Sequence, residues 1–338
     1  MECIKQDPVS LNRILWLDAL KCFAMFLVIW GHVIQYGVTD YLENDIHIGI
    51  YSFHMPLFMM ISGFFAGNIA KYSFGKFLKK KFIQLIFPCI IYGFLCSYIY
   101  IYIYIYIYGG SLLGKYFYCL WFLKSIFLCF VFYYPYAKYK NVYVLFFTIV
   151  LSLFVVYYKF NEMYICFLFG TFLREFERLV YRKIRLVSFL SATVFLFLFC
   201  FWNNEYLKIY YEHLGPFVLF DTSSSLTHYF SVLFYKIIIG LCGSVFLFCL
   251  FKMRSSLFQS SKLGRYISYM GKNTLYIYVF QYFFLETVLG VFLDLDNLDK
   301  YFTDLVLTPI LSLIILVFMN YLYVKIGKSF AMTFVFGR

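Results

Sequence analysis

Residues 13–32 read Arg13-Ile-Leu-Trp-Leu-Asp18-Ala-Leu-Lys21-Cys-Phe-Ala-Met-Phe-Leu-Val-Ile-Trp-Gly-His32. Beyond Arg13 the stretch is apolar except for three ionisable residues, and with the residues after it reaches the roughly 20 residues that a helix needs to cross a bilayer. At about 100° per residue, Lys21 and His32 lie about 20° apart and Asp18 lies within about 60° of Lys21. Asp18 and Lys21 are three residues apart, so we expect them to pair, which lowers the cost of burying both charges in lipid. The sequence therefore predicts a transmembrane helix with one polar face.

The composition of the whole chain is that of a membrane protein. Hydrophobic residues make up 63% of it and charged residues 14%, and the mean hydropathy is +0.79. A soluble globular chain is excluded because too little polar surface remains to face water. In such a chain a net charge of +12 indicates cytoplasmic loops rich in Lys and Arg rather than a nucleic-acid partner, so the expected surroundings are membrane lipid. The ten cysteines include no Cys-x-x-Cys pair, which argues against disulfides and a zinc site.

Ten apolar segments follow one another along the chain and predict an all-α, polytopic membrane protein. With both the N- and C-termini in the cytoplasm, the inner segments hold 22 lysines and arginines, and the outer loops hold four. This distribution follows the positive-inside rule and predicts a multi-pass protein of the cell membrane, with one domain at 1–338 and a membrane core at 13–329. The predicted spans are 14–36, 48–69, 82–108, 117–135, 142–158, 163–173, 187–202, 229–251, 273–292 and 305–324. The four outer lysines are Lys115, Lys159, Lys208 and Lys300, and the outer loops carry an acidic run at Asp294, Asp296, Asp299 and Asp304.

One predicted span contains five Ile-Tyr pairs, at residues 99–108. Their strict alternation would suggest a strand in a soluble protein. An open strand edge cannot be satisfied in lipid, so a helix is predicted here too.

Two histidines fall near the predicted outer side of the membrane. A rise of 1.5 Å per residue places His32 roughly 28 Å from Arg13. The helix that runs back inward begins His47-Ile-Gly-Ile-Tyr-Ser-Phe-His54, so His54 is also near the outer side. An imidazole can take a proton from a hydroxyl near neutral pH, as acyl transfer requires. The alternative for His32 is a hydrogen-bonded packing histidine, and packing is the preferred interpretation for His54. No metal is expected at His32, His47 and His54, because no carboxylate is placed to complete a site.

A basic run, Lys76-Phe-Leu-Lys79-Lys80-Lys81, precedes the third predicted span at its inner end. By charge, Lys79, Lys80 and Lys81 are candidates for binding phosphate. The alternative is the ordinary role of a juxtamembrane basic run, which is to fix topology and contact lipid head groups.

Four motifs in this order and spacing resemble the acyltransferase-3 family of membrane proteins. They are residues 13–32, then Phe53-His-Met-Pro-Leu-Phe-Met-Met-Ile-Ser62-Gly63-Phe, Leu120-Trp121-Phe-Leu, and Gly271-Lys-Asn273-Thr-Leu-Tyr-Ile-Tyr278. The resemblance extends from Arg13 to about Gln281. It implies transfer of an acyl group, most often acetyl from acetyl-CoA, to a sugar hydroxyl of a surface or secreted glycan. It also implies that His32 is catalytic, with Lys21 as its basic companion and Asp18 beside it.

The chain departs from the family pattern at two places. Lys81 and Gln84 stand where the family tends to carry two arginines, and Gln281 stands where many relatives have His. The first departure bears on how the CoA phosphates are held, and the second suggests that this position is not the base.

These observations combine into one expected mechanism. Acetyl-CoA would dock its phosphates at Lys79, Lys80 and Lys81, its arm would pass Asp18 and Lys21, and His32 would activate the acceptor at the outer side. The expected acceptor is a glycan or lipid-linked sugar, with His54, Trp121 and Asn273 as candidate contacts. Two other classes stay open on the sequence: a ten-span transporter or flippase, and a non-catalytic sensor of a lipid-linked glycan.

Overall fold

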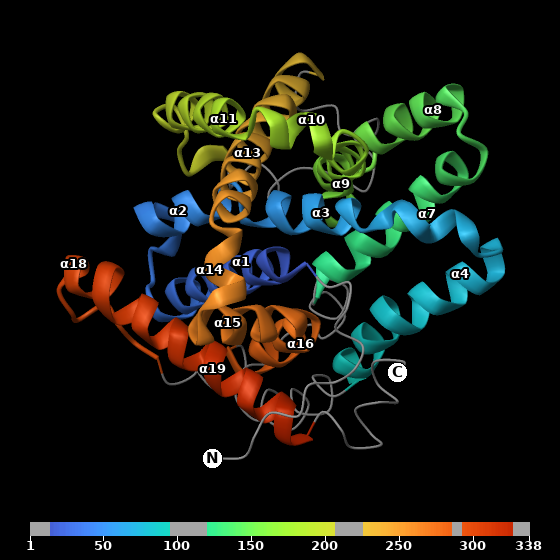
Figure 1. Ribbon diagram of the computed structural model, residues 1–338. Coiled ribbons are helices and arrows are strands. Elements are labelled where there is room, and N and C mark those ends of the chain that lie inside the picture. Colours follow the sequence, from blue (N-terminus) through green and yellow to red (C-terminus); the bar gives the residue numbers. More distant parts are fainter. Residues whose placement is uncertain (1–13, 95–119, 207–225, 286–292, 327–338) are drawn as a thin grey trace.

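The structure is a computed structural model, and it describes residues 14–94, 120–206, 226–285 and 293–326. Over these ranges the architecture is all helical, which confirms the predicted fold class (Figure 1). Residues 99–108, with the Ile-Tyr pairs, lie outside the described ranges. The α-helices are α1 (Leu15–Gly37), α2 (Asp45–Tyr51), α3 (His54–Phe64), α4 (Phe74–Lys81), α7 (Trp121–Tyr139), α8 (Val142–Leu153), α9 (Phe160–Glu175), α10 (Glu177–Arg182), α11 (Ile184–Phe199), α13 (Leu226–Met253), α14 (Ser255–Ser260), α15 (Lys262–Lys272), α16 (Thr274–Phe284), α18 (Lys300–Phe302) and α19 (Thr308–Ile326). Short 3-10 segments are η2 (Tyr41–Glu43), η3 (Ala66–Lys71) and η5 (Tyr157–Lys159), and π-helical segments are η4 (Phe82–Ile86) and η8 (Thr303–Leu307).

Within the described ranges, four helical stretches are long and apolar enough to cross a membrane. They are Leu15–Gly37, Asp45–Lys71, Thr227–Met253 and Lys300–Ile326. They coincide with the predicted spans 14–36, 48–69, 229–251 and 305–324. The other six spans and the orientation of the termini stay predictions.

Helix α1 lies at the centre of the bundle, with α2 and α3 on one side and α15, α16 and α19 on the other (Figure 1). It also packs against α13. Its side chains therefore meet protein on most sides, and Leu17, Leu20 and Ile29 are fully buried. Polar residues on such a helix face other helices rather than lipid, which is where ionisable groups in membrane proteins are found.

Three glycines bring helix backbones into direct contact. A Cβ on Gly63 of α3 would collide with the carbonyl oxygen of Phe167, and one on Gly170 of α9 would collide with that of Met60. A Cβ on Gly271 would collide with the carbonyl oxygen of Asp18. Small residues allow membrane helices to approach this closely. The last contact sets the start of α1 against the junction of α15 and α16.

The C-terminal end of α1, which is the outer end in the predicted topology, is tied to the last helix by hydrogen bonds. Trp30 Nε1 donates to Thr308 Oγ1 at 2.8 Å, and the backbone N–H of Leu295 donates to Gly37 O at 2.9 Å. Thr39 donates from both its backbone and its hydroxyl to Asp296, and these bonds lower the pKa of Asp296. Part of the acidic outer run thus anchors the end of the central helix.

Candidate active site

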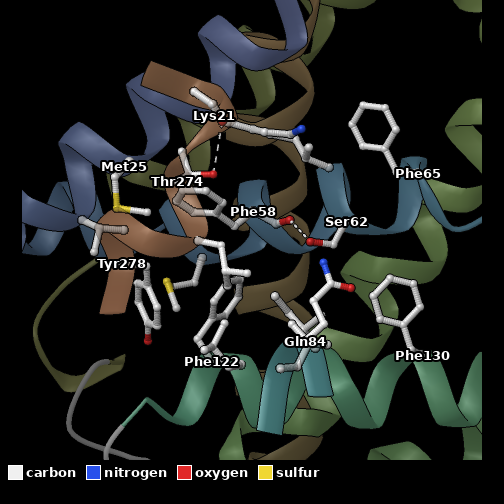
Figure 2. Close-up of a pocket in the computed structure, with 18 of the residues that line it drawn as sticks. Lys21, Met25, Phe58, Ser62, Phe65, Gln84, Phe122, Phe130, Thr274 and Tyr278 are labelled. Carbon is white, nitrogen blue, oxygen red and sulfur yellow. Dashed lines mark hydrogen bonds between the residues drawn. The ribbon is translucent and has the colours of Figure 1, made fainter. Parts of the chain in front are cut away.

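A cavity of about 240 Å³ lies beside the N-terminal half of α1, which is the inner half in the predicted topology. Figure 2 shows Lys21 and Gln84 reaching toward it from opposite sides. Its wall comes from α1, α3, α4, η4, α7, α15 and α16, so elements that are far apart in the sequence meet here. Lining residues include Lys21, Met25 and Val28 of α1, Phe58 and Ser62 of α3, Lys81, Gln84, Phe122, Lys272 and Tyr278.

Lys21 faces this cavity while it pairs with Asp18. Lys21 Nζ lies 3.2 Å from Asp18 Oδ1 and 4.4 Å from the centroid of the Phe65 ring. Asp18 is buried beneath it, where Gly271 packs on its backbone. The spacing of three residues predicted this ion pair. The pairing and the ring direct the ammonium toward the cavity.

Lys81 and Gln84 lie across the cavity from Lys21. Lys81 Nζ is 3.5 Å from Gln84 Oε1 and 3.7 Å from the centroid of the Phe130 ring. Between the two residues α4 gives way to the π-helical η4, and such π-bulges are frequent at functional sites. Burial, with a smaller effect from Lys80, lowers the pKa of Lys81 to about 8. This lysine therefore titrates close to neutral pH and is held where the chain departs from regular helix.

The other two candidate phosphate-binding lysines, Lys79 and Lys80, do not line the cavity. Lys79 is exposed, and the Lys80 ammonium lies 4.9 Å from the Tyr72 ring. The sequence placed Lys272 only among the cytoplasmic charges that set the topology, but in the structure this residue lines the cavity. Three lysines therefore line one cavity: Lys21, Lys81 and Lys272.

His32 lies about one helical turn beyond the far end of the cavity. Its Nδ1 is 3.0 Å from Gln35 Oε1, which also accepts a bond from the Tyr51 hydroxyl at 3.3 Å. Because an amide oxygen only accepts, Nδ1 must carry the proton and Nε2 keeps its lone pair. The Tyr282 ring meets the imidazole edge-on at 5.8 Å. Val28 and Tyr278, one turn closer to the cavity, line it, so α1 and α16 lead from the cavity to His32.

Two more histidines pack around Tyr51. His47 stacks on the Tyr51 ring at 4.0 Å, and His54 lies 4.6 Å from it with Nδ1 bonded to Ile50 O at 2.7 Å. Both histidines are buried. Across the described residues no group of three or more His, Cys, Asp or Glu side chains could hold a metal ion.

The remaining predicted contacts lie away from the cavity. Asn273 is buried, and its Nδ2 donates to Asn320 Oδ1 of α19 at 2.9 Å. Trp121 begins α7 and is partly exposed, with Lys159 Nζ 5.2 Å from its ring. Gln281 is fully buried; its Nε2 donates to Tyr278 O at 3.3 Å, and its Oε1 has no hydrogen-bond partner among the described residues.

Sequence reasoning missed Gln35 and Tyr51. Gln35 could have been found, because it follows His32 by three residues and so lies on the same face of the helix. Tyr51 could not, since its position depends on the turn between α1 and α2 and on Gly31. A Cβ on Gly31 would lie 2.8 Å from Tyr51 Cε2, so this glycine makes room for the ring.

The comparisons with known proteins identify the family of this chain. A family model described as an acyltransferase domain, acyltransferase-3, matches residues 14–324. Two relatives are the nodulation protein NolL of Sinorhizobium fredii (strain NBRC 101917 / NGR234) and that of Mesorhizobium japonicum (strain LMG 29417 / CECT 9101 / MAFF 303099). Each is 38% identical over 93 residues, which is 26% of this chain and 25% or 24% of the relative. The matched region thus spans about a quarter of either relative, and no solved structure matches. The family match over most of the length shows that this chain belongs to the acyltransferase-3 family.

Proposed function

We propose that this protein transfers an acetyl group from cytosolic acetyl-CoA to a sugar hydroxyl of a cell-surface or secreted polysaccharide, in the cell membrane. The observation that carries the proposal is the arrangement on α1. A cavity with three lysines lies at its inner half, and a histidine with its Nε2 lone pair set by Gln35 lies near its outer end. An acyl donor from one side of the membrane and an acceptor from the other could meet along this helix.

The inner cavity suits a CoA thioester by its chemistry. A CoA molecule carries phosphates at one end and its thioester at the end of a long, flexible arm. The ammonium groups of Lys81 and Lys272 are point charges of the kind that bind phosphate. The wall beyond them is mostly apolar, with Met25, Phe58 and Phe122, and suits the arm. We therefore place the phosphates at Lys81 and Lys272 rather than at Lys79 and Lys80.

Lys21 and Asp18 act on the donor in this proposal. Lys21 and His32 are eleven residues apart on one helix, which is roughly 16 Å along its axis. Lys21 is therefore too far from His32 to touch the same reacting atoms. Asp18 holds Lys21 toward the cavity, and Lys21 contacts the donor arm along its path.

His32 supplies the base. Its Nε2 accepts the proton of the acceptor hydroxyl while that oxygen attacks the thioester carbonyl carbon. A C–O bond forms, the C–S bond breaks, and the proton passes from His32 to the leaving sulfur. The products are the acetylated sugar and CoA with a free thiol. Gln35 keeps Nδ1 protonated through this cycle, so Nε2 is presented to the acceptor.

The test compares the glycans of cells that carry the wild-type protein, a deletion and His32→Ala at equal expression. Mass spectrometry and NMR measure O-acetyl groups on the isolated polysaccharide. We expect the deletion to lose them and His32→Ala to lower transfer by about 10²- to 10⁴-fold. His228→Ala is the matched control, because His228 is exposed on α13, and should match the wild type. Unchanged acetylation in the deletion would overturn the proposed function, and normal acetylation by His32→Ala would remove His32 as the base.

A further inference from the structure

Gln281 is a fully buried residue of α16 whose side-chain oxygen has no hydrogen-bond partner among the residues that the structure describes. Its Nε2 donates to Tyr278 O at 3.3 Å. A backbone carbonyl only accepts hydrogen bonds, so the atom that meets it must be the nitrogen of the amide, and Oε1 is the atom left without a partner. Burying an amide oxygen in this way costs free energy and is rare in folded proteins.

The position of Gln281 lies between the cavity and His32. Thr274 and Tyr278 of the same helix line the cavity (Figure 2), and Tyr282 meets the His32 ring edge-on at 5.8 Å. At about 100° per residue, Gln281 lies about 20° from Thr274 around the helix axis and about 60° from Tyr278. Helix α16 packs against α1. Gln281 therefore follows the cavity-lining residues and directly precedes the residue that contacts His32.

Polar side chains are scarce on this part of the path. Apart from its tyrosines, α16 carries two polar residues, Thr274 and Gln281. The Thr274 hydroxyl donates to Gly271 O at 3.3 Å. Near Tyr278 the cavity wall is formed by apolar residues such as Val28 and Phe122. Gln281 thus supplies a polar group beyond the point where the lining of the cavity has become apolar.

The chemistry of the amide oxygen limits the ligands that would satisfy it. An amide oxygen accepts a hydrogen bond and donates none, so the ligand must bring an N–H or O–H group. The arm of CoA, pantetheine, contains secondary amides, and the N–H nearest the sulfur is separated from it by a short ethylene link. Thr274 and Gln281 are roughly 10 Å apart along the axis of α16. A flexible arm spans this distance, and a compact donor such as acetyl phosphate does not.

We infer that Gln281 Oε1 accepts a hydrogen bond from the amide N–H of the donor arm nearest the sulfur, and so holds the thioester beside His32. Binding gives the buried oxygen a partner, so this hydrogen bond adds to the affinity for the donor. It also selects pantetheine thioesters over acyl donors without an amide arm. Neighbouring atoms cover the oxygen in this structure, so the arm must displace a neighbouring side chain to reach it. This inference rests on the proposed function, since it names a contact of the donor in that reaction.

The experiment measures binding to the purified full-length protein by isothermal titration calorimetry, without an acceptor. Three probes are used: CoA, a CoA analogue in which an ester replaces the amide nearest the sulfur, and phosphoadenosine diphosphate, which is the nucleotide half of CoA. We expect the wild type to bind CoA about tenfold more tightly than the ester analogue, because the ester has no N–H. Gln281→Met should bind CoA and the ester analogue equally, and the nucleotide half should bind both proteins alike.

The melting temperature separates this role from a packing role. Methionine has nearly the length of glutamine and no amide oxygen, so Gln281→Met without ligand should melt no earlier than the wild type. If it melts early, Gln281→Leu takes its place. Gln259→Met is the matched control, because Gln259 is exposed on α14, and should keep the preference for CoA over the ester.

The outcomes separate the inference from the proposed function. A wild type that binds CoA and the ester analogue equally, or a Gln281 variant that keeps the full preference for CoA, would overturn the inference alone. A wild type that binds no CoA would overturn the donor of the proposed function, and the inference with it. The binding assay does not depend on turnover, so an inactive preparation does not affect the comparison.

Discussion

The two ends of α1 hold their functional side chains in different ways. At the inner end, Lys21 and Lys81 lie over the Phe65 and Phe130 rings beside the cavity. An aromatic face attracts an ammonium without adding an opposite charge, so the charge of Lys81 stays available to an incoming anion, whereas Lys21 is paired with Asp18. At the outer end, His32 is held by a neutral amide that fixes its proton. In the proposed function, one end of the helix holds the donor, and the other moves a proton.

The largest effect is expected when the two cavity lysines proposed to bind phosphate, Lys81 and Lys272, are replaced together. Lys81→Ala with Lys272→Ala should raise the KM for acetyl-CoA by about 100-fold, because two phosphate contacts are lost. The kcat should change little, since contacts made equally in the ground state and the transition state affect binding alone. Initial rates with purified protein measure both constants. The matched control is Lys79→Ala with Lys80→Ala, which removes two neighbouring lysines outside the cavity.

The same site predicts a dependence on pH. With its pKa lowered to about 8, Lys81 is charged below that pH and loses its proton above it. The KM of the wild type should therefore rise as the pH increases through 8, and this rise should disappear in Lys81→Ala. A KM that stays flat up to pH 9, or a control pair as impaired as the cavity pair, would contradict the binding role of the inner end.

At the outer end, Gln35→Leu should lower kcat by about tenfold, because it removes one hydrogen bond that orients the base and such a bond contributes about 1 kcal/mol. The KM for acetyl-CoA should stay the same, because Gln35 acts through His32 and not on the donor. Gln259→Leu, at an exposed position of α14, controls for the change in side-chain type. Tyr51→Phe should cost less, and adding it to Gln35→Leu should cost nothing further, since Tyr51 acts through the Gln35 oxygen. Full additivity of the two changes would disprove this network.

The smallest expected effect comes from Gly31→Ala. The new methyl group would meet the Tyr51 ring, which must turn away and weaken its bond to Gln35. We expect kcat to fall by about two- to threefold with a melting temperature close to that of the wild type. The group in the way is a side-chain ring that can turn, so the cost should lie near the lower limit for overpacking, about 1 kcal/mol. Gly67→Ala, where a Cβ would meet nothing within 4 Å, serves as the comparison. A large loss of stability in Gly31→Ala alone would mean that Gly31 has a packing role and does not tune the base.

Hydropathy predicted the long spans well because it depends only on local composition. Helix α1 and the stretch Thr227–Met253 lie within two residues of their predicted bounds. The second span was predicted as one helix, but α2 ends at Tyr51 and α3 begins at His54. Pro56 has no N–H to donate to the carbonyl four residues earlier, which favours a break before it. An apolar run of constant hydropathy does not reveal that break.

The inner part of the site was predictable in kind but not in detail. Charge pointed to Lys79, Lys80 and Lys81 as one group. Consecutive residues on a helix point about 100° apart, so only Lys81 reaches the cavity. The contribution of Lys272 depends on the packing of Gly271 against Asp18, which is a tertiary contact. Neutral partners such as Gln35 have no charge or motif to draw attention to them.

Helix α1 runs unbroken from Leu15 to Gly37, so it also fixes the distance between the side chains that it carries. The gap between Lys21 and His32 cannot stretch or fold, so under the proposed mechanism donors would be selected by the length of their arm as well as by their charge. One residue inserted between the two would turn His32 by about 100° and take it off the working face. Four inserted residues would nearly restore the face but add roughly 6 Å to the gap. The protein would then be expected to need a donor with a longer arm. Insertions or deletions in this helix would in this way change which donors the protein accepts.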